Sequence, residues 1–255
     1  MKPTSDRFTN TVDYYSKYRP SYPEDVLNLL LNECQLSSSS IIADIGSGTG
    51  LLSCLFLKYG CTVFCVEPNE KMRESAEHQL CHFPNFHNIN GSAEATTLPS
   101  DSIDIVTAGT AFHWFDRDKA RNEFLRILKN NGYCVLIWNL RAEFSSPMMA
   151  AYENLLRQYG TDFNVKTPEK IADKEIFDFF GGAVNIKLYS NHQVLNEEGL
   201  IGRLLSTSYV PKPGQANFNE MLDQAHHLFR QYQIEGHVEF IYSTKCYYGM
   251  MKKSV

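Results

Sequence analysis

The chain has 255 residues, of which 43% are hydrophobic and 21% charged, and its formal net charge at pH 7 is -5. This length and composition allow one domain with a sizeable core and an appended lid. The acidic balance and the lack of any run of Lys or Arg argue against a nucleic-acid partner, and no apolar stretch approaches the roughly 20 residues that a membrane-spanning helix needs.

The first half of the chain alternates helical and strand patterns. Pro23 to Glu33 carries apolar residues at helical spacing, and 41–45 is an apolar run of strand length. The next expected elements are a helix at 51–59, a strand at 61–66, a helix at 70–80, strands near 86–90 and at 103–107, a helix from about Asp116 to Lys129, a turn at Asn131-Gly132 and a strand at 133–138. Strands separated by helices indicate βαβ units and a parallel sheet.

Beyond Asn139 the pattern becomes mostly helical. Ser146-Pro147 and Thr167-Pro168 each predict a helix start, so we expect a helical insertion at 140–180. The remaining expected elements are a strand at 184–190, a helix at 219–233 and a last alternating strand at 238–248.

A glycine-rich turn joins the first predicted strand to the helix after it. Gly46, Gly48 and Gly50 let the chain turn tightly, so that backbone N–H groups and the helix start can face a polar ligand. Glu67 ends the next strand about 20 residues later, where a carboxylate can accept both hydroxyls of a ribose. Because ligands of open α/β sheets bind outside the carboxyl ends of the strands, we expect Asp44, the turn and Glu67 to face one crevice.

The spacing of these glycines bears on which nucleotide the turn would bind. The dinucleotide fingerprint is G-x-G-x-x-G, whereas this chain has G-x-G-x-G and places Leu51 where the third glycine of that pattern would fall. NAD therefore fits less well. A turn that binds no ligand, and a Glu67 that only caps the helix starting near Asn69, are the alternatives.

Six segments carry a family resemblance. They are DIGSGTG at 44–50, VEPNEKM at 66–72, Gly91-Ser92-Ala93-Glu94-Ala95, Ala111-Phe112-His113-Trp114-Phe115-Asp116, the N-terminal Tyr15-x-x-Tyr18-Arg19-Pro20-x-Tyr22-Pro23 and the C-terminal Tyr242-x-Thr244-x-x-Tyr247-Tyr248-Gly249. Together they resemble class I S-adenosylmethionine-dependent methyltransferases, in particular the small-molecule branch that includes trans-aconitate methyltransferase-like enzymes. The resemblance covers nearly the whole chain, but its motifs are poor guides to the substrate.

The resemblance implies a doubly wound, Rossmann-like α/β fold with a mostly parallel seven-stranded sheet, an antiparallel last strand and a helical lid. The implied activity is methyl transfer from S-adenosylmethionine to a small metabolite by in-line displacement, with S-adenosylhomocysteine as the product. The expected domain organisation is an N-terminal helical lid segment at 1–36, an S-adenosylmethionine-binding α/β core at 37–139, a helical insertion at 140–182, and C-terminal strands at 183–255 with a helical cap at about 196–235.

The resemblance also implies which residues hold the amino-acid end of the cofactor. Gly46-Ser47-Gly48 would approach the methionine and ribose parts, and Asp44 would order that loop or bind the amino group. Thr110 would offer its carbonyl to the same amino group. Arg19 would pair with the cofactor carboxylate, and Tyr15 could close over it. A surface ion pair is the alternative role for Arg19.

The adenosine end has its own expected contacts. Glu67 would bind the ribose hydroxyls, and Pro68 would pack on the adenine. Ala93 through its backbone and Glu94 through its carboxylate would recognise the adenine edge, the carboxylate accepting from the exocyclic amine.

The sequence indicates fewer residues for binding the methyl acceptor than for binding the cofactor. His113 lies just past the fourth strand and is a candidate general base, because its ordinary pKa of about 6.5 suits proton exchange at neutral pH. A packed residue that shapes the pocket floor is the equal alternative, and a carboxylate acceptor would need no base. Trp114, Tyr18 and Tyr209 are the expected substrate-pocket residues.

The remaining expectations concern partners and setting. The eight histidines and seven cysteines show no convincing metal-ligand spacing, so we predict no metal. Irregularly spaced cysteines in apolar segments indicate reduced thiols in a cytoplasmic protein, which we expect to be a monomer or weak homodimer. Two other functions stay open: a methyltransferase-like protein that binds S-adenosylmethionine or a partner without turnover, and, less favoured, an NAD-dependent oxidoreductase.

Overall fold

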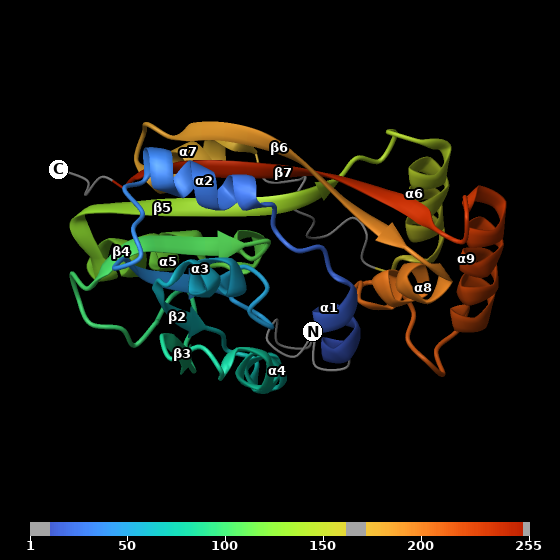
Figure 1. Ribbon diagram of the computed structural model, residues 1–255, viewed down its shortest axis with the longest axis horizontal. Helices are drawn as coiled ribbons and strands as arrows, with labels where there is room; N and C mark the ends of the chain where they lie inside the picture. Colours follow the sequence, from blue (N-terminus) through green and yellow to red (C-terminus); the bar gives the residue numbers. More distant parts are fainter. Residues whose placement is uncertain (1–10, 162–171, 252–255) are drawn as a thin grey trace.

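A seven-stranded sheet forms the centre of the computed structural model, which describes residues 11–161 and 172–251 (Figure 1). Its strands are β1 (Ile41–Ile45), β2 (Thr62–Val66), β3 (Phe86–Ile89), β4 (Ile103–Gly109), β5 (Leu128–Arg141), β6 (Asn185–Leu195) and β7 (Val238–Met250), in the order β3-β2-β1-β4-β5-β7-β6. β7 runs antiparallel to both of its neighbours, and the other pairs are parallel. The predicted fold class and the antiparallel last strand are therefore confirmed.

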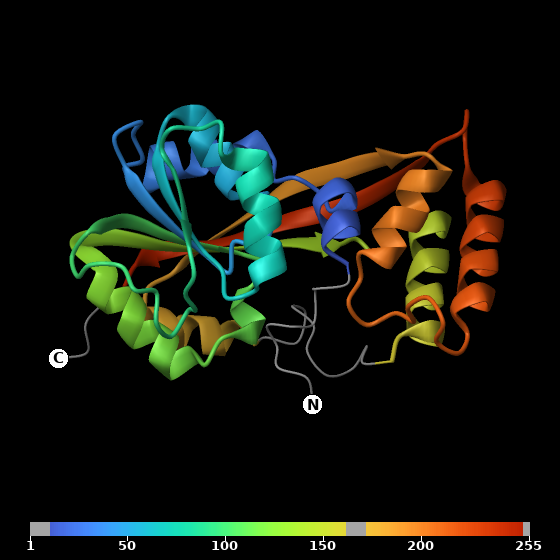
Figure 2. The same ribbon diagram turned by 90° about the horizontal axis from the view of Figure 1, so that it is seen from below.

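Helices cover both faces of this sheet, as Figure 2 shows. Helices α2 (Glu24–Glu33), α3 (Ser53–Tyr59) and α4 (Glu70–Leu80) pack on one face, where Leu30 and Phe56 are fully buried against Ile42. Helices α5 (Arg117–Ile127) and α7 (Asp173–Phe180) pack on the other, where Phe124 and Phe180 are fully buried. The two apolar cores fix the carboxyl ends of β1, β2 and β4 along one edge of the sheet.

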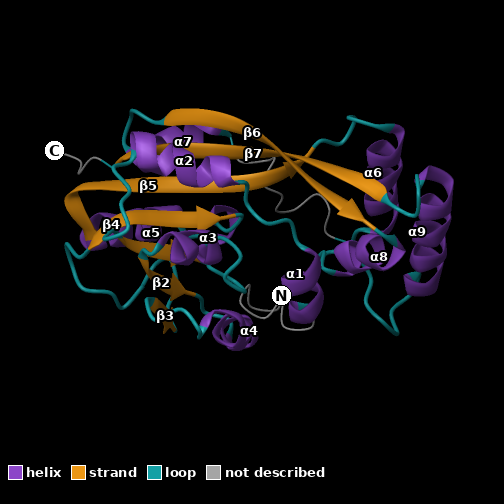
Figure 3. Cartoon of the chain, viewed as in Figure 1, coloured by secondary structure: helices purple, strands orange, loops and turns teal. Residues whose placement is uncertain are grey.

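A helical cap lies at the carboxyl end of β6 and the amino end of β7, which are paired (Figure 3). It consists of α6 (Pro147–Tyr159), α8 (Glu197–Leu205) and α9 (Phe218–Tyr232), which share a third apolar core. In that core the rings of Tyr152 and Phe240 meet edge to face with centroids 4.7 Å apart. The short helix α1 (Val12–Tyr18) packs against α8 and so lies between the cap and the sheet.

Two sequence expectations differ from the structure, and a third is not tested by it. The helix predicted to reach Lys129 ends at Ile127, and β5 already begins at Leu128, which pairs with Ile103 before a register shift; the expected turn at Asn131-Gly132 is part of this strand. The helices expected to form one insertion separate, because α6 joins the cap while α7 packs on the sheet. The helix start predicted at Thr167-Pro168 lies outside the described residues.

The contact between α1 and α8 depends on a glycine. A Cβ added to Gly202 would lie 2.2 Å from Cδ2 and 2.6 Å from Cγ of Tyr18, so the Tyr18 ring sits directly on the backbone of α8. The Tyr18 hydroxyl also donates to Glu198 at 2.5 Å.

We therefore expect Gly202→Ala to destabilise the protein by about 1 to 3 kcal/mol through overpacking. Helix propensity alone predicts the opposite sign, a gain of about 1 kcal/mol. Urea unfolding measures the difference, and the same substitution in a Tyr18→Ala background should recover most of the loss. A stabilised Gly202→Ala variant would mean that α1 does not dock on α8.

Within the part of the chain that the structure describes, none of the helices has the length and apolar character needed to cross a membrane.

Candidate functional site

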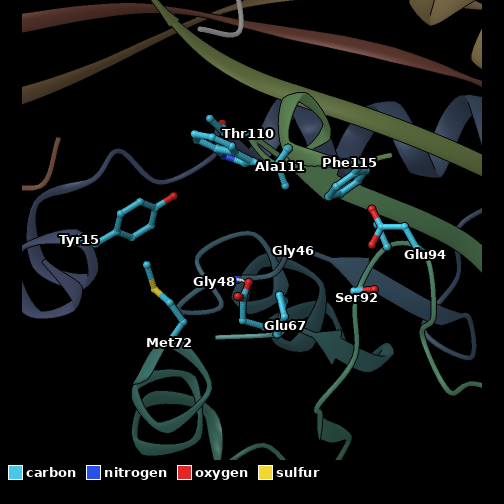
Figure 4. A pocket seen from close by; sticks show the side chains of 14 residues that line it. Tyr15, Gly46, Gly48, Glu67, Met72, Ser92, Glu94, Thr110, Ala111 and Phe115 are labelled. Carbon is cyan, nitrogen blue, oxygen red and sulfur yellow. Dashed lines mark hydrogen bonds between the residues drawn. The ribbon is translucent and has the colours of Figure 1, made fainter. Parts of the chain in front are cut away.

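A pocket opens at the carboxyl ends of β1, β2 and β4, and it has a volume of about 840 Å³ including its mouth. Figure 4 shows Tyr15 at one end and Glu94 with Ser92 at the other, with Gly48 and Glu67 between them. The residues that line it are Tyr15, Gly46, Gly48, Glu67, Pro68, Met72, Ser92, Ala93, Glu94, Gly109, Thr110, Ala111, Trp114 and Phe115.

The glycine turn forms the floor of this pocket. Gly46 and Gly48 have φ angles of +67° and +58°, in the left-handed region that side-chain-bearing residues rarely adopt. A Cβ on Gly46 would lie 2.7 Å from Cβ of Ala111, so the turn and the segment after β4 leave no room for a side chain. The N–H groups of Gly46 and Ser47 donate to the carbonyl of Val66, which ties the turn to β2.

Glu67 links the turn to the start of α4. Its Oε2 accepts from the N–H of Gly48 at 3.0 Å, and its Oε1 accepts from the N–H of Asn69 at 2.9 Å. The residue is only 9% exposed, and burial raises the pKa of its carboxyl. Glu67 is thus a buried carboxylate on the pocket wall rather than a solvated helix cap, and each oxygen has a further lone pair for a ligand hydroxyl.

Asp44 is 1% exposed and lies behind the turn. Its carboxylate accepts from Ser53 Oγ at 2.6 Å and from Thr107 Oγ1 at 3.0 Å, which joins β1 to α3 and β4. Burial raises its pKa from the ordinary 3.8 to about 6, against the opposing effect of these two hydroxyls.

The raised pKa of Asp44 predicts how the free energy of unfolding depends on pH. A carboxyl whose folded pKa is raised stabilises the fold most below its ordinary pKa of 3.8, and that contribution is lost as pH rises through about 6. Between pH 7 and 4 the wild-type free energy of unfolding should therefore rise, relative to that of Asp44→Asn, by about 2 kcal/mol. Urea unfolding of both proteins across this range measures the difference, and parallel pH profiles would contradict the assignment.

The opposite end of the pocket is formed by the segment after β3. Ala93 is buried there, and one carboxylate oxygen of Glu94 accepts from the N–H of Asp116 at 2.9 Å. Pro68 is exposed and faces the pocket from the end of β2. A flat group lying in this end would meet Pro68 on one side and polar edges at Ser92 and Glu94.

A second pocket, of about 510 Å³ including its opening to solvent, continues from the first and shares Tyr15, Gly46, Gly109 and Thr110 with it. Its other lining residues are Arg19, Pro20, Tyr22, Asp44, Ser47, Leu51, Leu52, Asn139 and Arg203. Thr110 has a φ of +53°, which is unusual for a β-branched residue, and its Oγ1 lies 3.3 Å from the hydroxyl of Tyr22. The strained backbone at Thr110 therefore lies where the two pockets meet.

All the residues predicted to bind the cofactor line one of these two pockets. Of the four residues predicted on the acceptor side, only Trp114 does. Trp114 lines the first pocket, and its ring contacts His113 with centroids 4.7 Å apart, but His113 lines neither pocket. Tyr18 lies between α1 and α8, and neither it nor Tyr209 is among the lining residues.

Several lining residues were not singled out from the sequence. They are Met72, Ser92, Gly109, Ala111 and Phe115 in the first pocket, and Tyr22, Asn139 and Arg203 in the second. Ser92, Ala111, Phe115 and Tyr22 fall inside the motifs of the family resemblance, which could have indicated them, whereas Arg203 has no local sequence signal.

The described residues, 11–161 and 172–251, contain no group of three His, Cys, Asp or Glu side chains placed to hold a metal ion.

Comparisons with known proteins agree with this geometry. A family model described as a methyltransferase domain matches residues 43–136, which include the glycine turn, Glu67 and Glu94. An uncharacterized methyltransferase of Schizosaccharomyces pombe is 30% identical over 209 residues, which cover 77% of this chain and 80% of the relative. A methyltransferase-like protein of the same yeast is 26% identical and matches 94% of this chain and 93% of its own length.

Solved structures share the fold. A type II methyltransferase assigned in Anaeromyxobacter dehalogenans superposes with a TM-score of 0.67 at 18% identity, covering 92% of this chain and 98% of its own. The YcgJ protein of Bacillus subtilis gives a TM-score of 0.58 at 19% identity, covering 91% and 100%. With this sheet order, the matched domain and a relative similar over most of its length, the chain belongs to the class I S-adenosylmethionine-dependent methyltransferases.

Proposed function

We propose that this chain binds S-adenosylmethionine across the two joined pockets and transfers its methyl group to a small-molecule acceptor. The observation that carries the proposal is the order of groups along the pocket: Tyr15 and the glycine turn at one end, Glu67 in the middle, and Ser92 with Glu94 at the other. That order matches an amino acid, a ribose and an adenine in sequence.

The residues present fit this cofactor in three respects. The turn carries no side chain at Gly46 and Gly48, both of which line the pocket, so a ligand can approach its backbone closely. Glu67 presents a buried carboxylate for the ribose hydroxyls. Arg19 has a buried Nε that no hydrogen-bond partner satisfies among the described residues, which suits a carboxylate ligand.

The individual roles follow from these positions. Gly46-Ser47-Gly48 would hold the methionine and ribose parts, and Pro68, Ala93 and Glu94 the adenine. Asp44, the Thr110 carbonyl, Arg19 and Tyr15 would hold the amino and carboxyl groups. The Arg19 guanidinium lies 4.9 Å from the centre of the Tyr15 ring, so the two residues act together as one cover over the turn.

When bound, S-adenosylmethionine supplies a methyl group on a positively charged sulfur, already activated for displacement. The protein then has to orient the acceptor and exclude water. Trp114, Ala111 and Phe115 form the wall beside the β4 end, where an acceptor would approach. Asp44 carries negative charge above its pKa of about 6 and would hold the ammonium group of the cofactor at neutral pH.

His113 stays a proposed general base. Its imidazole is half-buried and contacts the ring of Trp114, which lines the first pocket. An ionised carboxylate acceptor would need no base, and His113 would then only shape the wall. The proposed acceptor class comprises carboxylates, hydroxyls and amines of metabolites.

The test of turnover uses S-adenosylmethionine labelled on its methyl group. The purified protein is incubated with pools of small carboxylic acids, phenols and amines, and the product is separated by size. Labelled small molecules and released S-adenosylhomocysteine are the expected result. Cofactor binding without labelled product from any pool would favour the alternative of a methyltransferase-like binding protein.

A further inference from the structure

Arg203, on helix α8, is a buried cation with no carboxylate beside it. It is 2% exposed, its Nε donates to the hydroxyl of Tyr242 at 2.9 Å, and its Nη1 donates to Ser206 Oγ and Thr207 Oγ1 at 3.4 and 3.5 Å. All three partners are neutral hydroxyls, and in the described part of the chain no ion pair reaches this guanidinium. Buried charges are normally paired, because burial without a counter-charge is costly.

Arg19 brings a second guanidinium to the same place from the end of α1. Its Nη2 donates to the carbonyl of Ser206 at 3.0 Å, and its Nε is buried without a partner among the described residues. Burial and the neighbouring charge of Arg203 lower the pKa of Arg19. The two side chains thus repel each other, and no carboxylate among the described residues forms an ion pair with either of them, although Asp44 also lines this pocket.

Lys212 adds a third positive charge nearby. Its Nζ donates to the carbonyls of Leu205 and Thr207 at 3.2 and 2.6 Å, and burial together with Arg19 lowers its pKa to about 8. Carbonyls at the end of α8 account for the positions of Lys212 and Arg19, because helix C-termini favour cations. They do not account for Arg203, whose guanidinium donates hydrogen bonds only to hydroxyls among the described residues. It also lies 5.5 and 5.9 Å from the centres of the Phe240 and Tyr242 rings, but these contacts supply no counter-charge.

Both arginines line the second pocket, which joins the proposed cofactor pocket at Gly109 and Thr110. We propose that Arg203, together with Arg19, binds a carboxylate in this pocket. Two guanidiniums can hold a carboxylate through several parallel N–H···O bonds, with a geometry that Lys does not reproduce. The inference rests on the proposed function, and it leaves two sources for the carboxylate: the amino-acid end of the cofactor, and an acidic acceptor.

The first experiment tests whether the carboxylate bound by Arg203 is that of the cofactor. S-adenosylhomocysteine and 5′-methylthioadenosine, which lacks the amino-acid end, are each titrated calorimetrically into the wild type, Arg203→Lys, Arg203→Met and the control Arg230→Lys, at an exposed site on α9. If Arg203 binds the cofactor carboxylate, both Arg203 variants lose at least tenfold affinity for S-adenosylhomocysteine and none for 5′-methylthioadenosine. The control should match the wild type for both.

The second experiment tests the acceptor source. Malonate, succinate and citrate are titrated into the same proteins saturated with S-adenosylhomocysteine. If Arg203 binds an acceptor carboxylate, the wild type binds at least one of these acids, and the Arg203 variants lose tenfold or more while keeping their S-adenosylhomocysteine affinity. The inference is overturned if the Arg203 variants show a selective loss of affinity in neither experiment. It is also overturned if their affinities for S-adenosylhomocysteine and 5′-methylthioadenosine fall equally.

Tyr242→Phe is the variant that separates a loss of binding from a folding defect. It keeps Arg203 and the ring of residue 242 and removes the hydroxyl that accepts from Arg203 Nε and donates to Gln193. It should show the same selectivity with a smaller loss. A wild type that binds neither nucleoside would overturn the proposed function itself, whereas normal wild-type binding with unselective variants would overturn only the role of Arg203.

Discussion

Replacing Gly46 with alanine is expected to reduce the affinity for S-adenosylhomocysteine at least tenfold. The new Cβ would lie 2.7 Å from Cβ of Ala111 and 3.5 Å from the Phe115 ring, so the turn or the wall opposite must move. The φ angle of +67° adds about 1 to 2 kcal/mol of strain for an L-residue. Calorimetric titration measures the affinity, and urea unfolding measures the accompanying loss of stability.

Gly214→Ala is the matched control for this prediction. Gly214 has a φ of +83°, but a Cβ there would meet nothing within 4 Å. This variant should therefore show the backbone cost of about 1 to 2 kcal/mol in stability and an unchanged affinity. Equal affinities for Gly46→Ala and wild type would show that the cofactor does not lie on the turn.

The second large effect is expected at Glu67. Glu67→Ala should weaken binding of S-adenosylhomocysteine by about 1 to 3 kcal/mol, because it removes acceptors for the ribose hydroxyls and the bond that holds the Gly48 N–H. The first of these losses depends on the ligand, whereas the second does not. Adenosine and 2′-deoxyadenosine therefore separate them when both are titrated into the wild type and the variant.

The wild type should prefer adenosine, and Glu67→Ala should lose that preference. Glu239→Ala, at an exposed site on β7, is the control and should behave as the wild type. A variant that keeps the full preference for the 2′-hydroxyl would place the ribose elsewhere, and Glu67 would then be a structural link between the turn and α4.

The fold and the first pocket could be predicted because their signals are local. The turn from Gly46 to Gly50 requires glycine at fixed positions, and Glu67 follows at a distance set by one helix and one strand. Strand register then carries both to the same edge of the sheet, since Asp44 pairs with Cys65 and with Thr107. The turn, the strand that ends at Glu67 and the periodicity of each strand and helix can each be recognised within about 25 residues of sequence.

The cap side could not be predicted in the same way. Arg19 and Arg203 both bond Ser206, the first through its carbonyl and the second through its hydroxyl, although they are 184 residues apart, and nothing near either residue indicates the other. Tyr18 was expected in the pocket, but its ring packs on Gly202 instead, because α1 docks on α8. Helical periodicity assigns an apolar face to a helix without saying which partner covers it.

Helix α1 connects the proposed cofactor pocket to the helical cap. Tyr15 and Arg19 both come from α1 and its C-cap, and Arg19 bonds the end of α8 through the Ser206 carbonyl. The proposed cofactor pocket is therefore covered by a helix that is itself held by the cap. Changes in the α1–α8 contact, such as Gly202→Ala, are expected to affect stability and cofactor affinity together.

The central claim is that the joined pockets bind S-adenosylmethionine, and calorimetric titration of the wild type tests it most directly. S-adenosylmethionine and S-adenosylhomocysteine should each bind at one site with micromolar affinity, and NADH and NADPH should not bind. Absence of binding by both methyl-cycle ligands, or binding of a nicotinamide dinucleotide in their place, would contradict the account.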